Sequence, residues 1–151
     1  MEPIIGTLNM TLTIHVEPPT AAASYLGAAE SLMEGVRGLA GGPPAATVAL
    51  IFLACNAVEC ALKSFLANGR MTDEELKKPG IRHNLAGLWR LAFEKGLDIG
   101  EPPDWVKRLS EVHDWPYYLR YLTGVHGLVL PNAGITASEL DRLVEKVRLA
   151  R

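Results

Sequence analysis

An uninterrupted and mostly apolar stretch runs from Ala45 to Leu66, with the sequence AATVALIFLACNAVECALKSFL. It is long enough for about six turns of α-helix. A membrane span needs a similar length, but Asn56, Glu59 and Lys63 interrupt the apolar run at its centre and end. We therefore expect the central helix of a bundle, buried by the rest of the chain, and no membrane span.

The composition is that of a globular protein. The chain has 151 residues, of which 48% are hydrophobic and 21% charged, so we expect residues 1–151 to form one domain with a substantial core. Fifteen Lys and Arg residues against seventeen Asp and Glu residues leave a net charge of -2. This balance excludes the general basic excess that drives non-specific binding to nucleic-acid phosphates, and leaves a local basic patch open.

The two cysteines, Cys55 and Cys60, belong to the expected central helix. Residues five apart on a helix point to different faces, so we predict no disulfide between them. Both are interpreted as small core residues in a reducing compartment. The chain opens without the basic start and apolar run of a secretory signal, so the expected location is cytoplasmic.

The other helices are predicted from the spacing of apolar residues and from the residues that can cap helix ends. Two capping boxes, Thr72 with Glu75 and Thr136 with Glu139, predict helix starts at those points. Asn84 can cap another helix in the same way. Together with the proline and glycine breaks, these signals predict further helices that begin near residues 20, 72, 84, 104 and 136.

Two segments have the pattern of extended chain. Residues 7–16 alternate strictly between apolar and polar side chains, which is typical of a half-buried strand. The segment 117–130 is aromatic and β-branched and is punctuated by glycines, so it predicts extended pieces that pair with that strand. The expected fold is mainly α: an antiparallel up-and-down bundle of four to five helices with this small β element.

Two neighbouring segments carry a family resemblance. The sequence CNAVECALKSFLANGR begins at Cys55, and KKPGIRHNLAGLWRLA begins at Lys77. Together they resemble the HEPN superfamily, in particular bacterial members with a Glu-Ala-Leu-Lys helix followed by Gly-His-Asp/Asn-Leu. The resemblance covers about a third of the chain and implies an antiparallel, usually dimeric bundle of four or five helices. Members include RNases of toxin systems, partners of small nucleotidyltransferases and many proteins of unassigned role.

The resemblance places recurrent polar residues at Glu59, Lys63, His83 and Asn84, and a recurrent Arg-Tyr pair at Arg120 and Tyr121. The first four also have a physical interpretation. Asn84 can cap the helix that follows it, and His83 can reach Glu59 or a backbone carbonyl on the neighbouring helix. This structural role is favoured, but a buried cluster of Glu, Lys and His shifts pKa values, so a functional site stays open.

The HEPN RNase signature is an arginine, four to six intervening residues, and then a histidine. Arg120 and His126 fit this spacing, and so do Arg108 and His113. In such a pair the histidine moves the 2′-hydroxyl proton and the arginine stabilises the phosphorane charge without a metal. Tyr121 departs from the polar residue expected after the arginine. Arg120 and His126 are therefore a candidate active pair, and Arg108 with His113 a weaker one.

No metal site or cofactor is predicted from the sequence. The four histidines, at positions 15, 83, 113 and 126, show no helical i, i+4 pairing, and the cysteines lack the spacing of zinc ligands. No glycine-rich phosphate loop follows a strand, because Gly41 and Gly42 precede two prolines and lack the Lys-Ser/Thr of a P-loop.

Three functions remain open from the sequence. The first is a homodimeric interaction module in a toxin-antitoxin or nucleotide-related system, with an antitoxin or a nucleotidyltransferase as partner. The second is a metal-independent RNase that uses Arg120 and His126. The third is a bundle that binds a small molecule or nucleotide in a pocket lined by Glu59, Lys63 and His83.

Overall fold

The computed structural model describes residues 17–121 and 127–151, and this part of the chain is mainly helical. The mainly α prediction is confirmed. In chain order the elements are α1 (Ala21–Leu39), the 3-10 turn η1 (Pro44–Ala46), α2 (Thr47–Asn68), α3 (Asp73–Leu76), α4 (Leu85–Glu94), α5 (Asp104–His113) and α6 (Ala133–Leu149).

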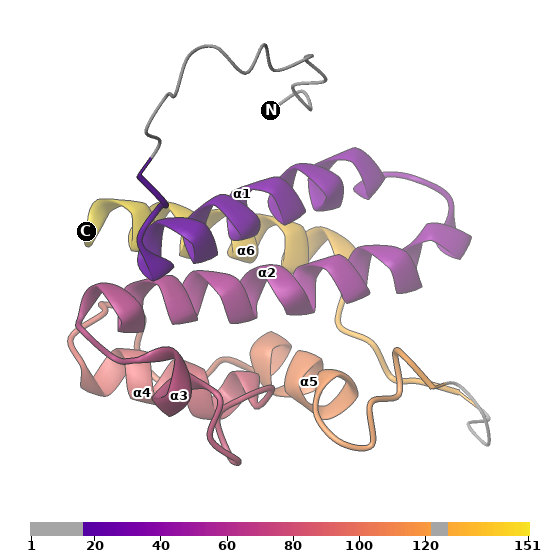
Figure 1. The fold of residues 1–151 in the computed structure, drawn as a ribbon. Helices are drawn as coiled ribbons and strands as arrows, with labels where there is room; N and C mark the ends of the chain where they lie inside the picture. The colour runs from indigo at the N-terminus through magenta and orange to yellow at the C-terminus, as the bar shows by residue number, and fades with distance from the viewer. Residues whose placement is uncertain (1–16, 122–126) are drawn as a thin grey trace, which may run out of the picture.

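Helix α2 lies in the middle of the bundle, as expected. Figure 1 shows α1 and α2 running in opposite directions, with α6 beside them and with α4 and α5 on the other side of α2. Helix α2 contacts α1, α4, α5 and α6. Its buried side chains therefore join α1 and α6 on one side to α4 and α5 on the other.

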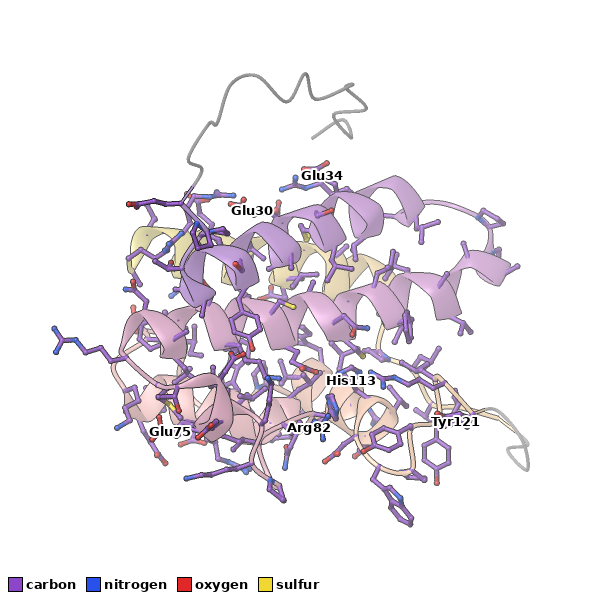
Figure 2. The ribbon with its side chains drawn as sticks, in the orientation of Figure 1. Glu30, Glu34, Glu75, Arg82, His113 and Tyr121 are labelled. Carbon is purple, nitrogen blue, oxygen red and sulfur yellow. The ribbon has the colours of Figure 1, made fainter. Side chains whose placement is uncertain are left out.

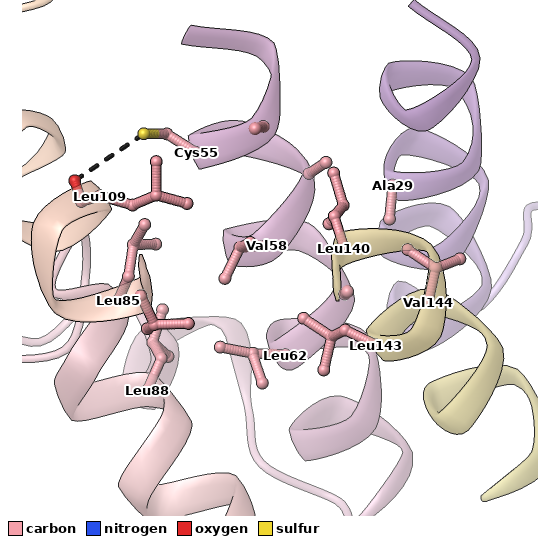
Figure 3. Packing of buried hydrophobic residues seen from close by; sticks show 14 of the residues in the cluster. Ala29, Cys55, Val58, Leu62, Leu85, Leu88, Leu109, Leu140, Leu143 and Val144 are labelled. Carbon is pink, nitrogen blue, oxygen red and sulfur yellow. Dashed lines mark hydrogen bonds between the residues drawn. The ribbon is translucent and has the colours of Figure 1, made fainter. Parts of the chain in front are cut away.

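The core consists mostly of aliphatic side chains and draws on all six described α-helices. Leu140 and Leu143 of α6 lie on one side of α2, and Leu85, Leu88 and Leu109 lie on the other (Figure 3). All five are buried. The thiol of Cys55 is also buried and donates to the carbonyl oxygen of Leu109 at 3.8 Å. Both cysteines are free, in agreement with the sequence prediction.

Within the described residues, one continuous helical stretch, Pro44–Asn68, is long and apolar enough to cross a membrane by length and composition. Its apolar residues are used inside the bundle, where Leu50, Ile51 and Leu62 are fully buried. The stretch also carries the buried ammonium of Lys63. These features are those of the core helix predicted from the sequence.

One of the two predicted capping boxes is confirmed and the other is wrong. The Thr72 hydroxyl accepts from the Glu75 amide, and the Glu75 carboxylate accepts from the Thr72 amide, at the start of α3. Helix α6 instead begins three residues before Thr136. The Asn132 side chain caps it by accepting from the Ile135 amide at 3.0 Å. Thr136 is therefore inside the helix and fully buried.

The small β element is not seen in the described part of the chain. The predicted strand 7–16 lies outside the described residues. The beginning of the predicted extended segment, 117–121, is a turn. Backbone amides of Arg120 and Tyr121 both donate to the Tyr117 carbonyl, at 2.9 and 3.0 Å, and Tyr117 has a φ of 63°. These two amides are therefore bonded within the turn and not to a strand.

Candidate functional site

A cluster of four polar side chains lies where α2 meets α4 and α5. We call it the Glu59 cluster, and its members are Glu59, Lys63, His83 and His113. Glu59 Oε2 lies 2.6 Å from His113 Nε2 and 3.1 Å from His83 Nδ1. Glu59 Oε1 lies 2.6 Å from Lys63 Nζ. The contact between Glu59 and His83 that the sequence predicts is confirmed.

Three different parts of the fold supply the cluster. Glu59 and Lys63 lie one turn apart on α2, and His113 is the last residue of α5. His83 belongs to the loop that leads into α4, one residue before its N-cap Asn84. Figure 2 shows His113 together with Arg82 of the same loop in the lower part of the bundle. The cluster therefore links α2 to the loop before α4 and to the end of α5.

Lys63 is buried, although lysine is rarely found inside a protein. Its ammonium donates to Glu59 Oε1 and, at 2.9 Å, to the backbone carbonyl of Arg82. The two acceptors replace part of the hydration that burial removes. Through the second bond, Lys63 also fixes the loop that carries His83.

The start of α4 is held by a second set of hydrogen bonds. The Asn84 side chain accepts from the Gly87 amide at 2.8 Å and from the Ser110 hydroxyl of α5 at 3.2 Å. Gly87 has a steric role, because a Cβ there would lie 2.9 Å from the carbonyl oxygen of Gly80. The loop can therefore pack closely on α4 and keep His83 near α2.

The charge on Glu59 explains the hydrogen bonding of the histidines. Burial disfavours the carboxylate, but hydrogen bonds from His113, Lys63 and His83 outweigh it and lower the pKa of Glu59 from 4.5 to about 2. An ionised carboxylate only accepts hydrogen bonds. His113 Nε2 and His83 Nδ1 therefore both donate to Glu59 Oε2.

A polar pocket opens beside the cluster. It has a volume of about 270 Å³, and its wall is formed by Lys77, Pro79, Gly80, Arg82, His83, Asn84, Asp114 and Tyr117. His83 is thus shared between the cluster and the pocket. The side chain of His113 is only 1% exposed, whereas that of His83 is 19% exposed. A ligand in this pocket would meet the cluster through His83.

The Arg-Tyr pair lies near the same pocket. The Arg120 guanidinium carbon is 5.7 Å from the centroid of the Tyr117 ring, and this ring packs edge-on against His83 with a centroid distance of 5.9 Å. Tyr121 is exposed. His126, the predicted partner of Arg120, lies outside the described residues.

His113 is the member of the cluster that sequence reasoning placed elsewhere. The sequence spacing pairs His113 with Arg108. In the structure Arg108 is exposed, whereas His113 is buried against Glu59. The helical period over 104–113 could have predicted its burial, because it places His113 on the same face as the buried residues Val106 and Leu109. No local spacing links it to His83, because the two histidines come from different elements.

The cluster offers both proton-transfer and metal-binding chemistry. One ligand atom from each of Glu59, His83 and His113 lies within 4.8 Å of the other two. Two imidazoles and a carboxylate can relay protons or bind a metal ion. Comparisons with models of protein families, with curated proteins and with solved structures find no significant match to this chain.

Proposed function

We propose that the chain is a HEPN-like helical module that binds a phosphate-bearing small molecule, a nucleotide, in the pocket beside the Glu59 cluster. The observation that carries the proposal is the meeting of this polar pocket with the buried cluster at His83. The family part rests on the sequence resemblance. The ligand part rests on the chemistry of the pocket wall.

The pocket wall suits an anionic group that is attached to a ring. Lys77 and Arg82 supply positive charge, and Arg82 is exposed on the loop next to His83. Guanidinium and ammonium groups are the usual partners of phosphate oxygens. Tyr117 supplies an aromatic face, on which a base can stack. The volume of about 270 Å³ is at the small end for ligand pockets, which favours a mononucleotide over a larger ligand.

Backbone strain at Tyr117 supports a functional role for this wall. Tyr117 has a positive φ of 63°, a conformation that costs a residue with a side chain about 1 kcal/mol or more. The strained residue is the one whose ring packs against His83. Such strain tends to occur where a side chain must be held in one orientation, as at a binding site.

A thermal-unfolding screen tests the proposal. The purified full chain is heated with nucleoside mono-, di- and triphosphates and with the matching nucleosides. At a concentration of about 100 times Kd, a bound nucleotide stabilises by about 2.7 kcal/mol, or roughly 5–10 °C in Tm. We expect the shift with phosphorylated compounds and a smaller one with the nucleosides.

Two arginine variants make the screen specific. Arg82→Ala removes one of the two exposed cations in the pocket wall, the one next to His83, and we expect it to lose most of the Tm shift. Arg90→Ala is the matched control, because Arg90 is an exposed arginine on α4 that does not line the pocket. The proposal fails if no nucleotide raises Tm at millimolar concentration, or if Arg82→Ala responds like the wild type.

The proposed module is a homodimer. Trp115 and Tyr121 have exposed fractions of 77% and 65%, and Val48 and Phe52 of α2 are also exposed. Large apolar side chains on a surface commonly mark a contact with another chain. These residues support a dimer that works in a toxin-antitoxin or nucleotide-related system with an antitoxin or nucleotidyltransferase partner. A monomer in light scattering at tens of micromolar protein would refute the dimer.

A second candidate function is a metal-independent RNase. Arg120 lies against the ring of Tyr117, which lines the same pocket, and this position favours the RNase. RNA is incubated with wild type, Arg120→Ala and His126→Ala in EDTA. We expect cleavage by the wild type alone if the two residues act as a pair. Equal cleavage by His126→Ala would remove this assignment.

A further inference from the structure

We propose that Glu59, His83 and His113 bind one divalent transition-metal ion of the zinc class. The three side chains come from α2, the loop before α4 and the end of α5, and their ligand atoms lie within 4.8 Å of one another. The sequence interpretation predicted no metal, because it considered only ligands that are close in the chain. The metal site does not depend on the nucleotide proposal.

The donor set selects the kind of metal. Two imidazole nitrogens and one carboxylate oxygen match the three protein ligands of many catalytic zinc sites, which keep a further position open. The same set also binds Fe²⁺ in mononuclear sites. Mg²⁺ and Ca²⁺ prefer ligand sets made of oxygen, so they fit this cluster poorly.

Two of the three distances between ligand atoms are near those that an ion requires, and all three are within 4.8 Å. Zinc binds nitrogen and oxygen at about 2.0–2.2 Å, which places neighbouring ligand atoms roughly 3–3.5 Å apart. Glu59 Oε2 lies 2.6 Å from His113 Nε2 and 3.1 Å from His83 Nδ1. A bound ion would replace the two donated protons, and each imidazole would then carry its proton on the other ring nitrogen.

Lys63 and the pocket complete the arrangement. Lys63 binds Glu59 Oε1 and so does not compete for Oε2, the oxygen that both imidazoles approach, while its second bond to the Arg82 carbonyl holds the His83 loop in place. Its positive charge repels the ion and weakens the affinity. His83 also lines the pocket, so an open coordination position on the pocket side would be accessible to a ligand.

Metal titration without nucleotide tests the proposal. The full chain is stripped of metal with a chelator, dialysed, and titrated with Zn²⁺ and with Co²⁺ as a spectroscopic probe. We expect one equivalent of bound metal and visible Co²⁺ bands typical of four- or five-fold coordination. The bound zinc is measured by elemental analysis after gel filtration.

Two variants locate the ion. We expect His83→Ala, at the more exposed ligand, to keep its helical circular dichroism and to weaken binding by at least about 10-fold. Glu111→Gln, which changes an exposed carboxylate of α5 that does not line the pocket, is expected to bind like the wild type. Absence of stoichiometric binding to the wild type, or equal binding by wild type and His83→Ala, would overturn the proposal. A nucleotide screen that fails while zinc binds would overturn the proposed function and leave the metal site.

Discussion

Replacing Glu59 by glutamine removes one charge from the centre of the cluster and preserves the shape of the side chain. Lys63 would then be a buried ammonium without its ion-pair partner, because its side chain is only 6% exposed. A lone buried charge is strongly destabilising. We therefore expect Glu59→Gln to lower the free energy of unfolding by much more than an ordinary surface substitution.

The magnitude follows from the pKa of Glu59. Its fall from 4.5 to about 2 means that the folded protein favours the carboxylate. At roughly 1.4 kcal/mol per pKa unit, this preference corresponds to about 3 kcal/mol. Mutational data on broken buried ion pairs give a similar range of about 3–5 kcal/mol. The expected loss is therefore about 3 kcal/mol at pH 7.

Urea denaturation followed by circular dichroism at pH 7, in EDTA, measures this loss. Glu34→Gln is the matched control, because Glu34 is a glutamate on α1 with a 70% exposed side chain in an ion pair with Arg37. It should change the free energy by less than about 1 kcal/mol. The double variant Glu59→Gln with Lys63→Met should be more stable than Glu59→Gln alone, since no buried charge is left unpaired. A loss of less than about 1 kcal/mol in Glu59→Gln would refute the reasoning.

Three further predictions concern stability. The pKa of Glu59 is lowered in the folded protein, so its contribution to the free energy of unfolding is complete above about pH 4.5 and is lost as pH falls towards 2. Urea titrations across this range should show a shallower pH dependence of stability for Glu59→Gln than for wild type. The buried hydroxyl of Thr136 has no hydrogen-bond partner among the described residues, so Thr136→Val should raise the free energy of unfolding by about 1 kcal/mol in urea, with a loss arguing for an unseen partner. Arg70 has a φ of 73° just after α2, so Arg70→Gly should raise the free energy of unfolding in urea by about 0.5–1 kcal/mol. The control Arg90→Gly, within α4, should lower it by about 1 kcal/mol. Equal effects of the two substitutions would contradict the strain argument.

Much of the helical fold was predictable from the sequence because its signals are local. The apolar run of α2, the Thr72 capping box and the Asn84 cap of α4 each act within a short stretch of the chain. The start of α6 was mispredicted because two capping residues compete there. Asn132 caps first, and Thr136 then falls on the buried face of the helix, although it has the sequence of a capping box.

The cluster was only partly predictable because it depends on tertiary packing. The ion pair of Glu59 and Lys63 follows from their i, i+4 spacing on one helix. The approach of His83 to Glu59 was one of two contacts expected from its position at the start of a helix, the other being a backbone carbonyl of the neighbouring helix. His113 reaches the same carboxylate from a helix that begins 21 residues after His83, and no periodicity links the two histidines.

The energetics of the Glu59 cluster favour a role beyond holding helices together. Burial of a carboxylate, an ammonium and two imidazoles carries a desolvation cost, and apolar side chains of similar volume avoid it. The neighbouring contacts of α2 are made by fully buried residues such as Leu62, Leu85 and Leu109, which already join these helices. Stability alone therefore gives little physical reason for four polar groups at this crossing. The proposed function gives one, because a ligand in the neighbouring pocket would contact the cluster through His83.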